Sequence, residues 1–326
     1  MSVHDGLAEG FEAHRSRLRA VAQRMLGSRS EAEDAVQEAW LRLARTEGDA
    51  VDNLGGWLTT TVSRICLDML RARASRREDP TGHPVADEDP GTPADSRPEQ
   101  EAVLADSVGR ALLIVLDRLG PAERVAFVLH DMFAVPFAEI APVVDRSLAA
   151  AKKLASRARR KVRGAPAVPG AELVRQRLVI EAFLAAVRAG DINAVLAVLA
   201  PDIVRRADRA ALSEGRPVEL HGARAVAKEI AAFGQNAHVA EVVLIDGVVG
   251  IVVAPYGRLR LALTVTTAHE KITGYELIAD PNRLRQLDLA VLDVGAQRAA
   301  GEHRIGRTTG ARARRGRSGD GDRPPA

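Results

Sequence analysis

The stretch FAEIAPVVDRSLAAAKKLASRARRKVR, residues 137–163, decides the fold of the middle of this chain. Two segments with apolar residues at helical spacing are separated by Asp145, Arg146 and Ser147, which interrupt the pattern. Ser147 is predicted to cap the second helix, because its hydroxyl can accept a hydrogen bond from a free backbone N–H. The apolar face of this second helix is expected to hold Leu148, Ala151, Leu154, Ala155 and Ala158.

The rest of the second helix is basic, with no acidic residue between Arg146 and Arg163. A narrow apolar face on a basic helix fits the recognition helix of a helix-turn-helix, which docks on the first helix and meets DNA in the major groove. A solvated basic helix on an unrelated protein is the plainer alternative. The residues predicted to contact DNA are Arg146, Ser147, Lys152, Lys153, Arg157 and Arg160.

Composition narrows the class of protein. With 326 residues the chain has room for two or three domains, and 46% hydrophobic residues with only 3% aromatic ones favour helices packed through Ala, Val and Leu. Cys66 is the only cysteine, which excludes an intrachain disulfide and a cysteine-based zinc site. No secretory signal and no run of about 18 apolar residues is present, so we expect a soluble, cytoplasmic protein without a membrane partner.

Three helices are predicted before residue 80. The first spans Leu7–Leu26, the second follows Ser30, which with Glu33 fits a capping box, and the third begins near Trp57. Leu41 stands among polar residues on the outer face of the second helix. That arrangement is compatible with a protein-docking surface and equally with an ordinary solvated face.

Two blocks carry a family resemblance. DAVQEAWLRL (34–43) with GGWLTTTVSRICLDMLRAR (55–73) resembles the second region of an extracytoplasmic-function sigma factor of the sigma-70 family. The segment from Leu116 to Val162 resembles the fourth region of the same family, the one that contacts the −35 element. The resemblance covers roughly the first half of the chain. It implies a protein that binds core RNA polymerase and directs transcription initiation at −10 and −35 promoter elements.

The resemblance also implies site residues. The second helix would dock on the β′ clamp helices of the polymerase, the fourth region would meet the β flap, and the basic recognition helix would contact the −35 element. A −10 base would be captured near the loop 47–56 and the start of the third helix, although Trp57 fits a core position as well. The polymerase candidates are Asp34, Gln37, Glu38, Trp40 and Leu41. The −10 candidates are Asn53, Trp57, Arg64, Arg71 and Arg73.

The second half of the chain has a different pattern. Helical segments at 172–189 and 192–199 precede four β-branched runs at 239–245, 248–254, 258–267 and 271–278. Asp246-Gly247 between two of these runs predicts a hairpin. This order resembles the SnoaL-like branch of the NTF2-like α+β cone, in which a curved antiparallel sheet covers helices and leaves a pocket.

We therefore predict a multidomain protein with two all-α domains followed by an α+β cone. An acidic stretch with five prolines, which cannot build a core, is expected to link the helical domains. The predicted divisions are sigma region 2 at 1–78, linker at 79–106, region 4 at 107–164, hinge at 165–171, cone at 172–290 and a disordered basic tail at 291–326.

The cone is predicted to be a fused regulator, with a packing module as the plainer alternative and a small-molecule ligand left open as a further partner. Acid–base candidates in it are Asp208, His221, His238 and His269, and no spacing among them demands a shared site. We predict no enzyme activity, no catalytic residue, no cofactor and no metal. Two other classes stay open: a helix-turn-helix regulator that acts without polymerase, and an NTF2-like enzyme with a DNA-binding appendage.

Overall fold

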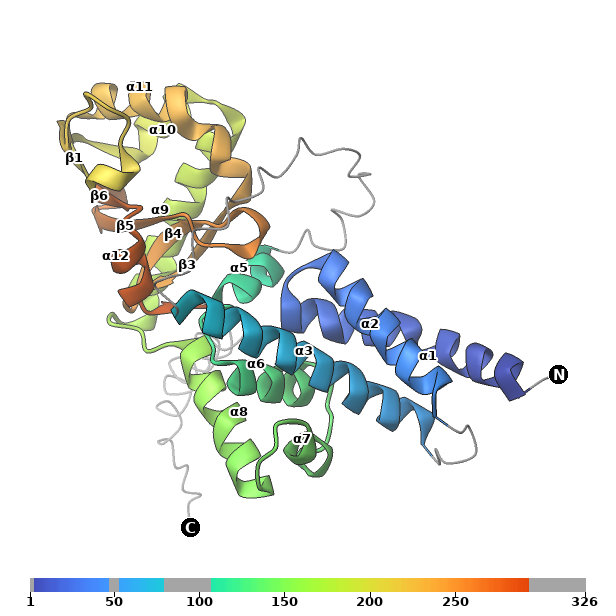
Figure 1. Ribbon diagram of the computed structural model, residues 1–326. Coiled ribbons are helices and arrows are strands. Elements are labelled where there is room, and N and C mark those ends of the chain that lie inside the picture. Colours follow the sequence, from blue (N-terminus) through green and yellow to red (C-terminus); the bar gives the residue numbers. More distant parts are fainter. Residues whose placement is uncertain (1–2, 47–52, 79–106, 293–326) are drawn as a thin grey trace, which may run out of the picture. The chain divides into compact units, whose positions relative to one another are not determined.

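The computed structural model describes residues 3–46, 53–78 and 107–292 (Figure 1). The predicted linker and most of the predicted basic tail lie outside these residues. The first part of the chain is helical and forms α1 (Val3–Leu26), α2 (Arg29–Ala44) and α3 (Leu54–Glu78). These helices pack through apolar stripes that include Leu18, Met25, Val36, Leu58 and Cys66, all buried. The three predicted helices are thus confirmed.

The start of α2 differs from the prediction. Ser28, and not Ser30, is the N-cap, and its side chain accepts a hydrogen bond from the backbone N–H of Glu31 at 3.4 Å. Gly27 in the left-handed region (φ 76°) ends the preceding helix, so the chain can turn into α2 two residues earlier than expected. The predicted capping box of Ser30 with Glu33 is therefore wrong.

The middle part is also helical and contains the predicted helix-turn-helix. Pro121 occupies the first turn of its helix, where its missing N–H costs little, and Pro142 lies inside a helix of only seven residues. The elements are α5 (Ser107–Leu116), α6 (Pro121–Phe127), the π-helical turn η2 (Val128–Met132), α7 (Phe137–Val143) and α8 (Leu148–Arg163).

The last part is an α+β cone. Its seven strands form one sheet in the order β2-β1-β6-β5-β4-β3-β7, antiparallel except for the β1–β6 pair. Helix α9 packs on strands β3 to β6, and α11 packs on β1 and β2. The helices are α9 (Gly170–Ala189), α10 (Ile192–Val198), α11 (Ala223–Phe233) and α12 (Pro281–Gln286). The strands are β1 (Leu199–Ala207), β2 (Glu219–His221), β3 (Ala240–Ile245), β4 (Val248–Val253), β5 (Leu261–Ala268), β6 (Lys271–Ile278) and β7 (Leu289–Ala290).

The predicted hairpin joins β3 to β4. Asp246 (φ 50°) and Gly247 (φ 83°) both have positive φ, as a two-residue type I′ turn requires. Strand β5 begins at Leu261 and not at Arg258, because a 3₁₀ turn over Pro255–Gly257 delays it. The predicted fold class, two helical parts followed by an α+β cone, is confirmed.

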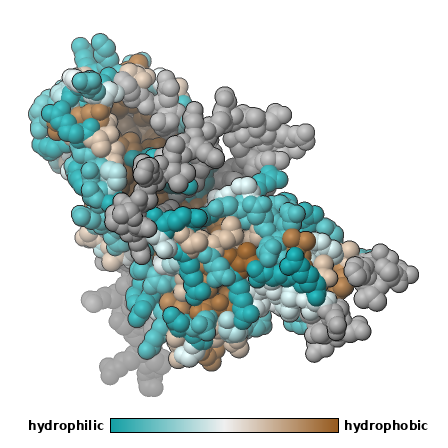
Figure 2. All heavy atoms as spheres, in the orientation of Figure 1, coloured by the Kyte–Doolittle hydropathy of each residue, from teal (hydrophilic) through white to brown (hydrophobic). Residues whose placement is uncertain are grey.

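The apolar interior is continuous from the helical parts into the cone. Leu70, Val115 and Val243 belong to one buried cluster, and the described residues up to Val291 form one compact unit. Figure 2 shows hydrophilic residues over much of the visible face, with hydrophobic residues inside the cone part and also among the helices. The buried core is rich in Ala, Val and Leu.

Candidate DNA and polymerase interface

The turn of the helix-turn-helix fixes where α8 begins. Asp145 adopts the left-handed conformation (φ 53°), and the backbone N–H of Arg146 donates to the carbonyl of Ala141 at 3.0 Å. Ser147 caps α8 as predicted, since its hydroxyl accepts from the N–H of Ala150 at 3.3 Å. These two hydrogen bonds fix the turn and set the start of α8 at Leu148.

The cations of α8 fall into two groups. Arg146, Lys152, Lys153, Arg157 and Arg160 are exposed. Two further cations are neutralised by the neighbouring helices: Arg159 pairs with Asp131 at 2.5 Å and Lys161 pairs with Glu123 at 2.7 Å. The exposed group, with Arg146 just before α8 and the other four cations on it, is the predicted DNA-binding set apart from Ser147, which is also exposed.

One part of the predicted apolar face is wrong. Ala151, Ala155 and Ala158 are buried, but Leu148 is 46% exposed. Leu148 is the first residue of α8, directly after the cap, where the helix has only begun. An exposed leucine beside the cations can contact an apolar group, such as the methyl of thymine.

The predicted polymerase candidates lie on the outer face of α2. Asp34, Gln37 and Leu41, three or four residues apart, are exposed, and Leu41 is 42% exposed. The Glu38 carboxylate accepts a hydrogen bond from the guanidinium of Arg42, one turn later, at 2.9 Å. Trp40 faces the other way, with its ring centroid 5.0 Å from that of Phe11, and supports the helix from beneath.

Charge pairing ties α2 to α1. Arg15 pairs with Glu33 at 2.6 Å, and this hydrogen bond lowers the pKa of the Glu33 carboxyl and raises the pKa of Arg15. Both side chains are substantially exposed, so the pair orients the helix more than it stabilises the fold.

The predicted −10 candidates occupy different environments along α3. Asn53 precedes the helix and accepts from the N–H of Gly56 at 2.9 Å, and Trp57 is half-buried against the core. Arg64 is exposed and donates to the carbonyl of Pro142 in α7 at 3.1 Å. Arg71 is exposed beside Asp68 at 3.5 Å.

Arg73 has a structural role. Its guanidinium donates to the carbonyl of Leu26 at 3.0 Å and forms an ion pair with Glu31. These contacts fasten α3 to the end of α1 and the start of α2. These contacts use part of the donor capacity of the Arg73 guanidinium for holding the three helices together.

Two arginines that were not predicted from the sequence contact the cone, one in α5 and one in the turn that follows α5. Arg110 forms an ion pair with Glu241 of β3, and Arg118 donates to the carbonyl of Leu284 in α12 at 2.6 Å. The N–H of Val291 donates to the carbonyl of Val162 near the end of α8 at 2.8 Å. A lone glutamate in the otherwise apolar strand AEVVLI was the one sequence feature that could have indicated such a partner.

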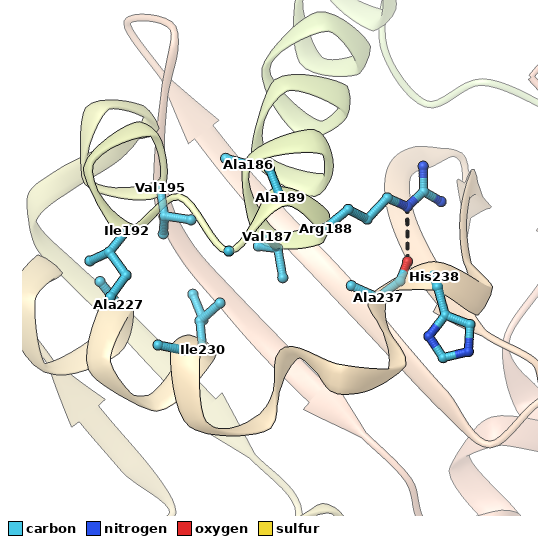
Figure 3. Close-up of a pocket in the computed structure, with 12 residues that line it drawn as sticks. Ala186, Val187, Arg188, Ala189, Ile192, Val195, Ala227, Ile230, Ala237 and His238 are labelled. Atoms are coloured by element: carbon cyan, nitrogen blue, oxygen red, sulfur yellow. Dashed lines mark hydrogen bonds between the residues drawn. The ribbon is translucent and has the colours of Figure 1, made fainter.

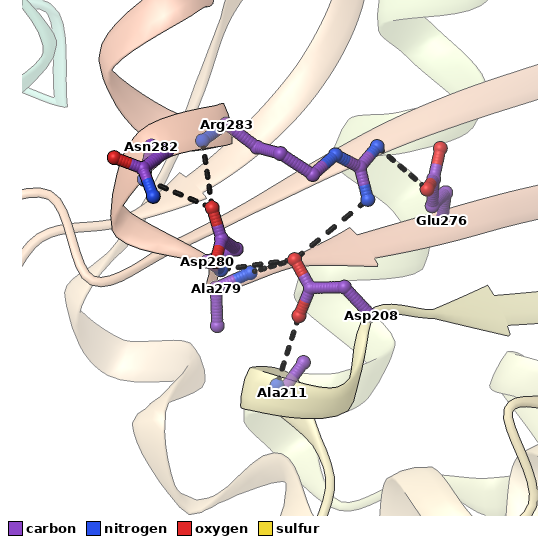
Figure 4. Close-up of polar contacts among 7 residues, drawn as sticks. All are labelled: Asp208, Ala211, Glu276, Ala279, Asp280, Asn282 and Arg283. Carbon is purple, nitrogen blue, oxygen red and sulfur yellow. Dashed lines mark hydrogen bonds and ion pairs between the residues drawn. The ribbon is translucent and has the colours of Figure 1, made fainter.

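Asp208 is a bracing residue in the cone (Figure 4). Its carboxylate accepts from the N–H groups of Ala211 (3.0 Å), Ala279 (3.0 Å) and Asp280 (2.9 Å). Asp280 in turn caps α12 by accepting from the N–H of Arg283 at 2.9 Å. Asp208 thus ties the end of β1 to the start of α12.

The three histidines named with Asp208 do not form a site. His221, His238 and His269 are exposed, and His221 lies 3.1 Å from Glu219. In the ranges that the structure describes, no group of three or more His, Cys, Asp or Glu side chains is placed to hold a metal ion. Nor does any helix within those ranges combine the length and apolar character needed to cross a membrane.

Two of the hollows among the described residues lie in the cone. One of about 430 Å³ lies between α9, α10 and α11 (Figure 3), with Val187, Ile192 and Ile230 in its lining. The other, of about 360 Å³, lies between α9 and the sheet and is mostly apolar. Val187 and Ile230 belong to both linings, so these side chains stand between the two hollows.

Comparison with known proteins decides the family. Residues 11–76 match the model of Sigma-70 region 2, and residues 110–162 match that of Sigma-70 region 4. The chain is 38% identical over 208 residues to the probable ECF RNA polymerase sigma factor SigI of Mycobacterium tuberculosis, which covers 64% of this chain and 72% of SigI. The chain belongs to the ECF RNA polymerase sigma factors.

A second relative of this sigma factor is the ECF RNA polymerase sigma factor SigJ of Mycobacterium tuberculosis. It is 46% identical over 204 residues, which cover 61% of this chain and 64% of SigJ. The match to the crystal structure of SigJ spans 85% of this chain and 98% of the SigJ chain, with 33% sequence identity and a TM-score of 0.42. The main functional prediction, an ECF-type sigma factor, is confirmed, and the alternative of a regulator that acts without polymerase is not favoured.

Proposed function

We propose that this sigma factor binds core RNA polymerase through α2 and the helix-turn-helix part, and reads promoter DNA through α3 and α8. The observation that carries the proposal is the division of α8 into buried alanines and exposed cations. The proposed −35 contacts are Arg146, Ser147, Lys152, Lys153, Arg157 and Arg160. The proposed −10 contacts are Asn53, Trp57, Arg64 and Arg71, while Arg73 is assigned to holding α3 in place.

The proposed −35 surface works through two kinds of contact. Lysine and arginine side chains along an exposed helix face neutralise phosphates and fix register, and an arginine can also take guanine O6 and N7. The first turn offers only Leu148 and three alanines, so base contacts are assigned to the later residues Lys152, Lys153 and Arg157.

Salt dependence tests this assignment. Each phosphate contact contributes about −0.9 to the slope of log affinity against log salt. Arg146→Ala and Arg160→Ala, the two proposed cations left for phosphate contacts, should each make the slope shallower by about 0.9 and reduce run-off transcription from a cognate promoter with core polymerase. Lys161→Ala is the matched control, because Lys161 lies on the same helix but is paired with Glu123. Equal slopes in the unchanged protein, the two variants and the control would reject α8 as the DNA-binding helix.

The proposed polymerase contact is the stripe of Asp34, Gln37 and Leu41 on α2, with Glu38 beside it and Trp40 beneath it. A leucine exposed among polar groups fits the core of a docking surface, where apolar contact supplies affinity and polar neighbours supply specificity. Leu41→Glu should abolish co-elution with core polymerase, whereas Lys152→Ala should leave co-elution unchanged. Co-elution of Leu41→Glu at the level of the unchanged protein would exclude this face.

We further propose that the cone is a built-in regulator without enzyme activity, in a protein that acts in the cytoplasm. Arg110 of α5 and Arg118 of the turn after α5 contact the cone, and Val291 links the cone to the end of α8. The carboxylate of Asp208 is occupied by three backbone N–H groups, which leaves it poorly suited to acid–base work. The proposed divisions are those predicted from the sequence, with the hinge at 165–171 between the two functions.

A further inference from the structure

The hollow between α9 and the sheet has a wall made by three neighbouring strands, β4, β5 and β6. Residues two apart in a strand face the same side, so each strand contributes two of them. The wall residues are Ile251, Val253, Leu261, Leu263, Tyr275 and Leu277. Phe183 and Leu184 of α9 lie opposite this wall. The volume of about 360 Å³ falls within the range of about 300–1,000 Å³ that is typical of small-molecule sites.

Tyr275 is the polar residue of this wall. It is only 7% exposed, and its ring centroid lies 6.5 Å from that of Phe183. Its hydroxyl has no hydrogen-bond partner among the residues that the structure describes, yet its oxygen is not sealed inside the protein. Because Tyr275 lines the hollow, this oxygen meets open space there. A mostly buried hydroxyl without a partner costs free energy, which an acceptor on a bound molecule would recover.

The Tyr275 hydroxyl acts as a donor. Burial raises its pKa, and the negative charge of Glu229 raises it further, although Arg205, the residue paired with Tyr275 across β1 and β6, acts in the opposite direction. The hydroxyl therefore stays protonated at neutral pH and can donate to an acceptor inside the hollow.

Glu229 of α11 supplies an acceptor near this donor. Its Oε2 accepts from Arg205 at 2.6 Å and from Arg216 at 3.1 Å. Its other oxygen, Oε1, accepts no hydrogen bond from the described part of the chain and is not sealed inside the protein either. Glu229 also lines the hollow, and its charge acts on Tyr275. An otherwise apolar hollow thus carries one donor and one acceptor that both lack a partner.

We propose that the cone binds a neutral molecule that has an apolar body and one hydroxyl group. The hydroxyl oxygen of this molecule accepts from Tyr275, and its O–H donates to Oε1 of Glu229, so that one group satisfies both. The body lies against Phe183, Ile251 and Leu263, where it is removed from water. A few polar groups in an apolar cavity orient a ligand in this way. No covalent bond changes: the molecule is a ligand and not a substrate.

A ligand in this hollow would touch the loop that Asp208 braces. Leu212 and Ser213 line the hollow beside Ala211, whose N–H donates to Asp208 at 3.0 Å. Asp208 also accepts from the N–H of Asp280, the N-cap of α12. The ligand therefore contacts the segment that joins β1 to α12. An effect of the ligand on transcription rests on the proposed regulatory function of the cone, whereas the binding itself does not.

Three probes with the same aromatic body test the binding. They are 2-naphthol, 2-methoxynaphthalene, which lacks the O–H donor, and naphthalene, which lacks the oxygen as well. Equilibrium dialysis of the full chain at pH 7 measures each affinity without polymerase. The chain should bind 2-naphthol saturably, and it should bind either analogue about tenfold more weakly, because Oε1 of Glu229 is then covered without receiving a hydrogen bond.

Tyr275→Phe tests the donor. This change removes only the hydroxyl, so it should weaken binding of 2-naphthol about fivefold without weakening that of naphthalene. Thr264→Val is the matched control, because it removes a hydroxyl from β5, the strand next to Tyr275, and Thr264 does not line the hollow. The control should bind 2-naphthol as the unchanged protein does.

Three results would overturn the site: no saturable binding of 2-naphthol, equal binding of either analogue, or equal affinities for 2-naphthol in Tyr275→Phe and Thr264→Val. Should Tyr275→Phe fail to fold, Leu263→Trp fills the hollow from the sheet and must abolish binding of 2-naphthol instead.

Run-off transcription with and without 2-naphthol separates this site from the proposed regulatory function. Binding without any change in transcription keeps the site and rejects its regulatory use. Loss of transcription in Arg160→Ala depends on neither.

Discussion

Cys66 shows how strongly the helical core shields a reactive group. Burial raises the pKa of its thiol to about 12, although the charge of Arg124 acts in the opposite direction. The thiolate is the form that reacts with alkylating agents, so the folded protein should resist iodoacetamide at pH 8 and the urea-unfolded protein should react at the rate of a free cysteine. Mass spectrometry after timed quenching measures both rates. Equal rates would mean that α3 opens from the core readily.

At the scale of single residues, the sequence predicts best where one local contact decides the outcome. Ser147 was predicted correctly because Asp145 and Arg146 interrupt the apolar pattern directly before it, whereas near α2 Ser28 and Ser30 compete as caps and the sequence favoured the wrong one. Arg73 could not be assigned from the sequence, because its partners Glu31 and Leu26 come from another helix and from a helix end. The prediction that Leu148 is buried was wrong, because helical spacing does not say how far the neighbouring helix extends.

Among the structural elements, the β3–β4 hairpin makes the sharpest stability prediction. Gly247 has a left-handed φ of 83°, and an added Cβ would lie 2.7 Å from the carbonyl oxygen of Ala165, between α8 and α9. Gly215 has a similar φ of 80° with open space around it. Gly215→Ala should cost about 1–2 kcal/mol for the conformation alone, and Gly247→Ala clearly more because the backbone at Ala165 must move. Urea unfolding of both variants measures the difference, and equal losses would contradict the clash.

The elements that the sequence predicted are those with local patterns. Four β-branched runs and Asp246-Gly247 indicated β3 to β6, because alternation and turn chemistry are read within ten residues. The parallel pairing of β1 with β6 was not predicted, since it joins segments about seventy residues apart whose side chains do not specify a partner. Helix α11 was missed although its Ala-rich segment has a helical pattern.

For the molecule as a whole, the sequence predicted separate modules, and the structure adds the contacts that join them. Arg110 and Glu241 are 131 residues apart in the chain, and Arg64 and Pro142 are 78 apart. No periodicity or motif reports such pairs. The family and the order of the parts could be inferred from local motifs, whereas the way in which the cone could restrain α5 required coordinates.

The ion pair between Arg110 and Glu241 makes the prediction that decides whether the cone regulates. The Glu241 side chain is 3% exposed, whereas that of Arg110 is 38% exposed. Arg110→Gln leaves the buried Glu241 carboxylate without this cation and should lower the free energy of unfolding by about 1–3 kcal/mol. Glu241→Gln should lower it by less, because this change removes the buried charge itself. Both changes loosen α5 from the cone, so both should raise run-off transcription with core polymerase.

The control for this test is Glu219→Gln, which breaks the exposed Arg206–Glu219 pair of the cone at 3.5 Å and should change neither stability nor transcription. A rise in transcription in both contact variants, despite their unequal stabilities, would separate release of α5 from general loosening of the fold. If run-off transcription stays unchanged, or falls in proportion to the free energy of unfolding, the cone is instead a packing module. The contact between β3 and α5 would then hold the helices together without controlling them.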